Sequence, residues 1–345
     1  MRRTQTSHRT AFTLWGLVIA LLILFPACII IGSVNIPIGE VINAVTGNDV
    51  SKETWRIIII ETRIPMACTA MLAGAALSVA GLLLQTTFDN PLAGPSILGV
   101  STGSSLGVAI VMLALGGSIG QSVSTYLSVL SGAIIGAGII MLILLAFSTI
   151  VKNSIMLLII GIMVSYLASS AISLLNFFST QEGIHSFVIW GLGNFSGVTM
   201  DRLPLFSILV IASVALSFML IKPLNALLLG TRYAENLGVN IRATRNKLLI
   251  LSGILTAVVT AFCGPIGFIG LIVPHIARLA LQSSNHVTLL PATALCGAVI
   301  ALLCTFISVL PASSGVIPIN AITPVIGVPI IIYIILNRKR ILYFN

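Results

Sequence analysis

Residues 124–148 read STYLSVLSGAIIGAGIIMLILLAFS, a run of 25 residues without a charged side chain. An α-helix rises about 1.5 Å per residue, so roughly 20 apolar residues cross the hydrocarbon core of a bilayer. This stretch is therefore long enough to span a membrane as one helix.

Comparable apolar runs recur along the whole chain. Of its 345 residues, 57% are hydrophobic and only 7% are charged, whereas soluble domains carry about 25% charged residues. So few charges could not cover a soluble surface. We predict an all-α, polytopic membrane protein, a single transmembrane domain over residues 1–345 with about ten helices. The predicted spans are 11–31, 64–85, 96–116, 124–148, 155–176, 203–221, 246–263, 265–282, 289–311 and 319–336.

Two of these spans need comment. The first could instead be a signal peptide, but its uninterrupted apolar length favours a retained helix. The eighth is the weakest, because Pro and Gly interrupt it; both are tolerated in buried membrane helices. Residues 35–62, between the first two spans, are expected to form an outer loop along the membrane interface, where Trp55 is favoured.

The distribution of basic residues predicts the orientation. With the N-terminus inside, 13 of the 17 Lys and Arg residues fall in inside segments. The outside segments hold only Lys52, Arg56, Arg63 and Arg202. Lys and Arg are enriched in cytoplasmic loops, so both termini are predicted to be cytoplasmic. The net charge of +9 is scattered over the ends of apolar runs rather than gathered in a stripe, so we expect no nucleic-acid partner.

Small residues are expected to serve packing. Glycines recur at four-residue spacing at Gly99, Gly103 and Gly107 and again at Gly132 and Gly136, which lets helix backbones approach closely. The five cysteines lie in or beside apolar segments without a CxxC pair, which is typical of small packing residues rather than disulfides or zinc ligands.

Several kinds of chemistry are missing from the chain. No Gly-Lys dipeptide occurs, so a GxxxxGK[ST] phosphate loop is impossible. The four histidines have no metal-ligand spacing, and we expect neither a metal site nor a cofactor. No Asp or Glu falls well inside a predicted span, although such residues usually mark ion pathways. An energy source outside this chain is therefore expected.

Residues 264–279 read GPIGFIGLIVPHIARL, which resembles the signature of the FecCD-type permeases, membrane subunits of ABC importers for iron-siderophores, haem and cobalamin. Other stretches agree in the same order. They are RIP at 63–65, NPLAGP at 90–95, LGVSTG at 98–103, LGVN at 237–240, and Pro318, Thr323, Gly327 and Pro329 of the ending PxGxxTxxxGxP. The resemblance covers nearly the whole chain.

The resemblance implies a homodimer of ten-helix subunits in the bacterial inner membrane, with a pathway between the two copies. It implies two cytoplasmic ATP-binding subunits, an extracytoplasmic substrate-binding protein and surrounding lipid as partners. ATP would bind the partner subunits, so the chain would hold no cofactor and be no enzyme by itself. The substrate would be a metal chelate or a corrinoid, without a choice between iron-siderophore, cobalamin and haem.

The chain departs from the family pattern at three places. Met66 stands where the family's RLPR often has a second Arg. Val316 stands where an acidic residue usually precedes the PxG ending, and Asn320 replaces its Gly. The segment that often begins LGE here begins with Leu229-Gly230-Thr231.

The resemblance also assigns candidate roles to residues. Arg63 would pair with a carboxylate of the binding protein, or else anchor the helix at the headgroups. Asn90-Pro91-Leu92 would form a cytoplasmic gate, with Asn153-Ser154 as a second gate. The family-motif residues expected to be structural are Gly264, Pro265, Gly267, Gly270, Pro274, His275 and Arg278.

The longest cytoplasmic loop, about residues 222–247, would couple the chain to the ATPase. A short helix is expected within it, ended by Gly238, because glycine is a common residue just after a helix. The coupling residues are Thr231, Arg232, Ala234, Glu235, Asn236, Leu237 and Gly238. The alternative is a solvated basic loop that only sets the orientation of the chain in the membrane.

Two other functions stay open at this stage. An ion-coupled secondary transporter is disfavoured by the missing intramembrane acids. An intramembrane enzyme using His275 and Arg278 lacks an evident pair of nucleophile and base.

Overall fold

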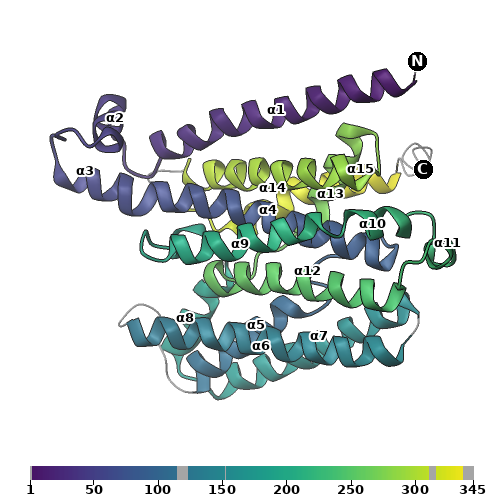
Figure 1. Cartoon of the computed structure of the whole chain (residues 1–345). Coiled ribbons are helices and arrows are strands. Elements are labelled where there is room, and N and C mark those ends of the chain that lie inside the picture. The colour runs from purple at the N-terminus through teal and green to yellow at the C-terminus, as the bar shows by residue number, and fades with distance from the viewer. Residues whose placement is uncertain (1, 115–122, 152, 311–315, 337–345) are drawn as a thin grey trace.

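The computed structural model describes residues 2–114, 123–151, 153–310 and 316–336. Lys152 and the basic residues 338–340, which contributed to the predicted orientation, lie outside these ranges. Within them the regular structure is helical throughout, and the long helices run side by side as a bundle (Figure 1). The all-α prediction is confirmed for this part of the chain.

The long helices are α1 (Arg2–Ile30), α4 (Ile64–Phe88), α6 (Val123–Ile150), α7 (Ser154–Phe178), α12 (Ile241–Cys263) and α14 (His286–Val309). The helices of intermediate length are α5 (Val100–Ala109), α8 (Gln181–Gly191), α9 (Leu203–Phe218), α13 (Ile269–Leu281) and α15 (Ile319–Leu336). The short elements are α2 (Ile38–Thr46), α3 (Glu53–Ile57), α10 (Ile221–Leu227), α11 (Thr231–Asn236), the π-helical segments η1 (Ile58–Arg63) and η2 (Ile110–Ala114), and the 3₁₀ turn η3 (Phe195–Gly197).

Six helices in the described ranges are long and apolar enough to cross a membrane. The pair α9 and α10 passes as a seventh if counted together, although its axis bends by 54°. Three more apolar helices are shorter, namely Val100–Ala114, Ile269–Leu281 and Ile319–Tyr333. Each of the ten predicted spans overlaps one of these elements. The polytopic membrane fold is confirmed, and ten complete crossings stay a prediction.

The structure differs from the prediction at two span boundaries. The helix of the second span starts before residue 64, because a continuous helical stretch runs over Glu53–Phe88. Residues 53–62 of the expected outer loop are therefore helical, and α2 adds a further helix within it. The eighth span has no helix before Ile269. Pro265 and two glycines weaken helix formation there, and the chain forms a turn instead.

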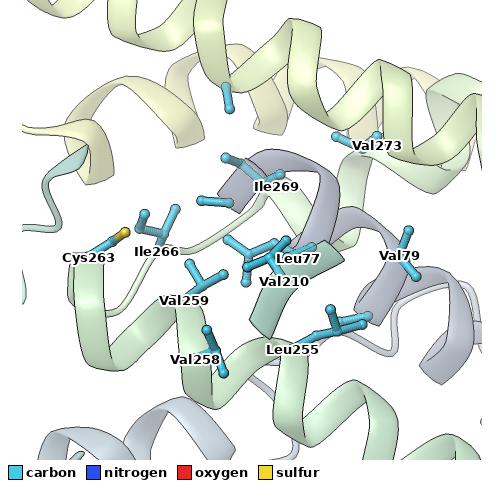
Figure 2. Packing of buried hydrophobic residues seen from close by; sticks show 14 of the residues in the cluster. Leu77, Val79, Val210, Leu255, Val258, Val259, Cys263, Ile266, Ile269 and Val273 are labelled. Atoms are coloured by element: carbon cyan, nitrogen blue, oxygen red, sulfur yellow. The ribbon is translucent and has the colours of Figure 1, made fainter. Parts of the chain in front are cut away.

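The core lies around α4, which is apolar on every side and packs against α14, α12, α13 and α9. Figure 2 shows part of this core, which includes Leu77 and Val79 of α4, Val210 of α9, and Leu255, Val258 and Val259 of α12. A second cluster joins α5, α6 and α7. Helix α1 lies along the outside of the bundle beside α14 (Figure 1).

The glycines pack as their spacing predicts. A Cβ at Gly107 would strike the backbone of Gly132, and one at Gly136 would strike the backbone of Gly103. Helices α5 and α6 therefore touch through their backbones. All five cysteines are free, and each is buried except the half-buried Cys68. Cys28, Cys263 and Cys296 belong to the core cluster, as expected of small packing residues.

The two ends of the bundle differ in what they carry. Helices α2 and α3 lie at one end and α11 at the other (Figure 1). The turn after α4 and the α13–α14 connection share the α11 end, because Thr86 bonds His286 and His286 bonds Asn225 of α10. Segments predicted to be cytoplasmic thus lie together at one end.

Candidate functional site

The turn after α4 is built by its own side chains. Asp89 ends the helix in a left-handed conformation with φ 45°, and Pro91 cannot continue the helix. The Asn90 carboxamide accepts a hydrogen bond from the Leu92 amide at 2.9 Å, an Asx-turn. Leu92 is left 46% exposed. The turn thus presents a partly exposed apolar side chain, and its role as a gate stays a prediction.

His275 joins this turn to α13. Its Nε2 lies 2.7 Å from the Pro91 carbonyl oxygen, so the imidazole carries its proton on Nε2 and donates it. His275 is 7% exposed. The sequence predicts a structural role for His275, and the structure adds that its partner is the predicted gate.

The second predicted gate lies at the start of α7. Asn153 is exposed and caps α7 by accepting the Ile155 amide at 2.8 Å. Its turn and the Asn90 turn border the same apolar cluster, which contains Ala93 and Leu157. The two turns therefore border one cluster, and Asn153 itself serves as a helix cap.

Arg245, which the sequence analysis did not single out, fixes the second turn. It is 8% exposed and donates to Ser148 Oγ at 3.1 Å, to the Val151 carbonyl at 2.9 Å and to the Ser148 carbonyl. These carbonyls lie at the end of α6, where helical partners are lacking. The first residues of α12 thereby bind the turn before α7.

Helix α11 projects from this end of the bundle. Thr231, Arg232, Glu235 and Asn236 are exposed, and so are Tyr233 at 60% and Leu237 at 59%. Gly238, at φ 83°, ends the helix as predicted. Ala234 is the exception, at 0% exposed.

The orientation of Ala234 narrows the predicted coupling set. Its side chain faces the interior of this chain, so it is not available to a partner in this arrangement. Tyr233 and Leu237, four residues apart, lie on one face of the helix. Tyr233 was missed because six residues are too few to show a helical period.

The motif 264–268 forms the turn that precedes α13. Gly264 has φ 75° and Phe268 has φ 68°. Asn320 binds this turn: its Oδ1 accepts the Gly267 amide at 3.1 Å, and its Nδ2 donates to the Pro265 carbonyl at 2.6 Å. The turn and Asn320 line an open cavity of about 250 Å³ together with Ser96, Ser101 and Pro324.

The rest of the motif fastens α13 to α4. A Cβ at Gly81 would strike the Gly270 carbonyl, so these two helices also meet backbone to backbone. Pro274 lies inside α13. Arg278 donates to the Gln85 Oε1 at 2.7 Å, and Gln85 donates to the Leu271 carbonyl at 3.0 Å.

Arg63 closes the other end of the bundle. It is 4% exposed and donates to the carbonyls of Ile29 at 2.9 Å and Ile30 at 2.8 Å, and to that of Val34. Its guanidinium therefore satisfies carbonyls at the end of α1. Docking to a partner carboxylate stays a prediction, and it would compete with these contacts.

Known proteins share this architecture and these motifs. The model of the FecCD transport family matches residues 20–337. The chain belongs to the FecCD transport family. It is 35% identical over 288 residues to the "Vitamin B12 import system permease protein BtuC" of Citrobacter koseri, covering 82% of this chain and 84% of the relative. The Salmonella typhi protein of the same name is also 35% identical, with 82% and 85% covered.

A solved structure agrees with these relatives. It is described as a metal-chelate type ABC transporter in an inward-facing conformation, with a TM-score of 0.81 and 31% identity. The match covers 94% of this chain and 98% of the solved one. The FecCD chain is thus a permease subunit of an ABC importer in the bacterial inner membrane. It is not itself an enzyme, and ATP hydrolysis lies in a separate subunit.

Proposed function

We propose that this FecCD chain works as a homodimer that imports a metal chelate or a corrinoid by alternating access. The likeness to vitamin B12 permeases over 82% of the chain carries this proposal, and the metal-chelate type of the solved relative supports it. Two copies would face each other across a pathway, with lipid around them. ATP would bind the two partner subunits, so this chain needs no cofactor of its own.

The cytoplasmic end supplies the moving parts. Leu92 and the turn at Asn153-Ser154 close the pathway toward the cytoplasm, and α11 seats in the ATP-binding subunit. Its exposed pair Tyr233 and Leu237 supports this role, because aromatic and apolar side chains dominate the centres of interfaces. The binding protein delivers substrate at the opposite end, near α2 and α3.

The distribution of carboxylates supports an external energy source over ion coupling. All eight Asp and Glu residues lie in the described ranges, and none is buried; Glu40 is half-buried and the others are exposed. An ion-coupled carrier would be expected to hold a carboxylate inside the membrane.

Uptake by reconstituted vesicles tests the proposal. The permease, its ATP-binding subunits and its binding protein are purified together, and uptake of cobalamin, a ferric hydroxamate chelate and haem is compared with and without ATP. We expect ATP-dependent uptake of one of these classes. Uptake driven by an ion gradient without ATP, or no uptake of any of them, would contradict it.

A further inference from the structure

The turn before α13 adopts a conformation that an ordinary residue avoids. Phe268 has φ 68° and ψ −38°, and the Ile269 amide donates to the Gly267 carbonyl at 2.8 Å. This i to i+2 hydrogen bond with positive φ at its centre is the rare form of the γ-turn, which is strained. Such a turn persists only when its surroundings hold it.

Asn320 is what holds it. Its carboxamide oxygen accepts from the Gly267 amide, and its nitrogen donates to the carbonyls of Pro265 and, at 3.2 Å, Gly191. Both N–H donors of a carboxamide are thereby used, together with its acceptor. The Asn320 side chain lines the cavity but has no donor left for a ligand. Its hydrogen bonds stabilise the turn instead.

Helix α13 connects this turn to the cytoplasmic gate. The helix begins at Ile269, directly after Phe268, and His275 in the same helix donates to the gate residue Pro91. Between them Gly270 rests on Gly81 of α4, where even a Cβ would overlap. The strained turn therefore adjoins the start of the same helix that carries the α4 contact and the gate contact.

We propose that Asn320 is a positioning residue that holds the strained turn at Phe268, and that release of this turn moves α13 and the His275–Pro91 contact at the gate. The proposal rests on the proposed function, because it treats the cavity and the gate as two ends of one pathway. Asn320 stands where the family's ending has a glycine. The proposal gives this departure a function, which is to link the cavity to the gate.

Hydrogen exchange in the purified permease tests the proposal without substrate. In Asn320→Ala, the amides of Gly267 and Ile269 should exchange at least about tenfold faster. The peptide covering residues 89–95 should also exchange faster, because α13 no longer holds Pro91. Asn194→Ala is the matched control, since its carboxamide oxygen accepts from Ser196 within its own turn and, in the described part of the chain, from no other residue. Wild-type exchange in either peptide of Asn320→Ala overturns the proposal.

Transport coupling separates positioning from simple stability. The transport ratio is the amount of cobalamin or ferric hydroxamate chelate taken up per ATP hydrolysed. In the full complex, Asn320→Ala should lower this ratio at least about fivefold. A merely structural role would lower transport and hydrolysis together and leave this ratio unchanged. An unchanged ratio in a folded Asn320→Ala complex therefore overturns the proposal.

Rescue at Phe268 identifies the strain itself. Glycine adopts positive φ freely, so Phe268→Gly added to Asn320→Ala should restore the transport ratio to within about twofold of wild type. Phe268→Ala removes the same ring but keeps the Cβ, so it should not restore the ratio. Equal effects of the two replacements would overturn the role of strain. If the wild-type complex transports none of the probes, the proposed function is contradicted. The hydrogen-exchange experiment still decides the proposal on Asn320.

Discussion

Arg63 shows how the surroundings of one residue change the role that can be assigned to it. From the sequence it is a cation at the outer end of a span, suited to docking. In the structure its guanidinium donates to three carbonyls around the end of α1. The partners lie 29 to 34 residues away, and no local pattern reports such a pairing.

Replacing Arg63 should therefore weaken the fold. Arg63→Met keeps a long side chain but leaves buried carbonyls without donors, and each such group costs about 1–3 kcal/mol. Because three carbonyls lose their donor, we expect a loss of about 3 kcal/mol or more, seen as a lower unfolding temperature in detergent, with Arg63→Lys intermediate. Unchanged stability with weaker docking of the binding protein would instead favour the docking role.

His275 and Asn320 show the same limit of sequence reasoning. The sequence singles out both residues, His275 because it lies in a family motif and Asn320 because it replaces the family's glycine. Their partners Pro91 and Pro265 are 184 and 55 residues away. Long-range pairs form only when the whole bundle has assembled, so one sequence shows the residues and not the contacts.

At the scale of elements, the coupling role of α11 can be tested by comparing substitutions on its exposed side and on its buried side. Leu237→Asp changes an exposed side chain, so the permease should unfold at the wild-type temperature but lose the copurifying ATP-binding subunit. Ala234→Trp overfills an internal site and should cost about 1–3 kcal/mol of stability. Glu235→Ala should do least, since a charge at the rim mainly tunes association. A stoichiometric ATPase subunit in the Leu237→Asp complex would place coupling elsewhere.

The contact between α4 and α13 depends on the absence of a single carbon atom. Gly81→Ala should destabilise the permease by about 1–3 kcal/mol, because the new Cβ overlaps the Gly270 carbonyl. Gly138→Ala on α6 is the matched control, as no atom of the described residues outside its own stretch of helix lies within 4 Å of its Cβ position. It should be neutral or stabilising by up to about 1 kcal/mol. Equal unfolding temperatures for the two variants would contradict the close contact.

At the scale of the whole molecule, apolar length and glycine spacing predicted most of the architecture. Both depend on local periodicity, which a single sequence contains. Bends are different: the span predicted over 203–221 continues through α10 at 54° to α9, because tertiary packing sets where a helix turns. The turn before α13 was foreseen as an interruption, but its γ-turn required Asn320 from another helix.

The path of the chain through the membrane can be decided at that bend. Glu182 in α8 and Arg232 in α11 are both exposed, and α9 with α10 lies between them. If the bent pair is one crossing, the two residues face opposite sides. Single cysteines at these positions, in a background without the five buried or half-buried natural ones, should differ in labelling by an impermeant thiol reagent. The cysteine replacing Glu182 should react in intact cells, and the one replacing Arg232 only after the membrane is opened. Labelling of both from outside would make the α9–α10 pair a re-entrant segment, and the reverse pattern would invert the predicted orientation of the whole bundle.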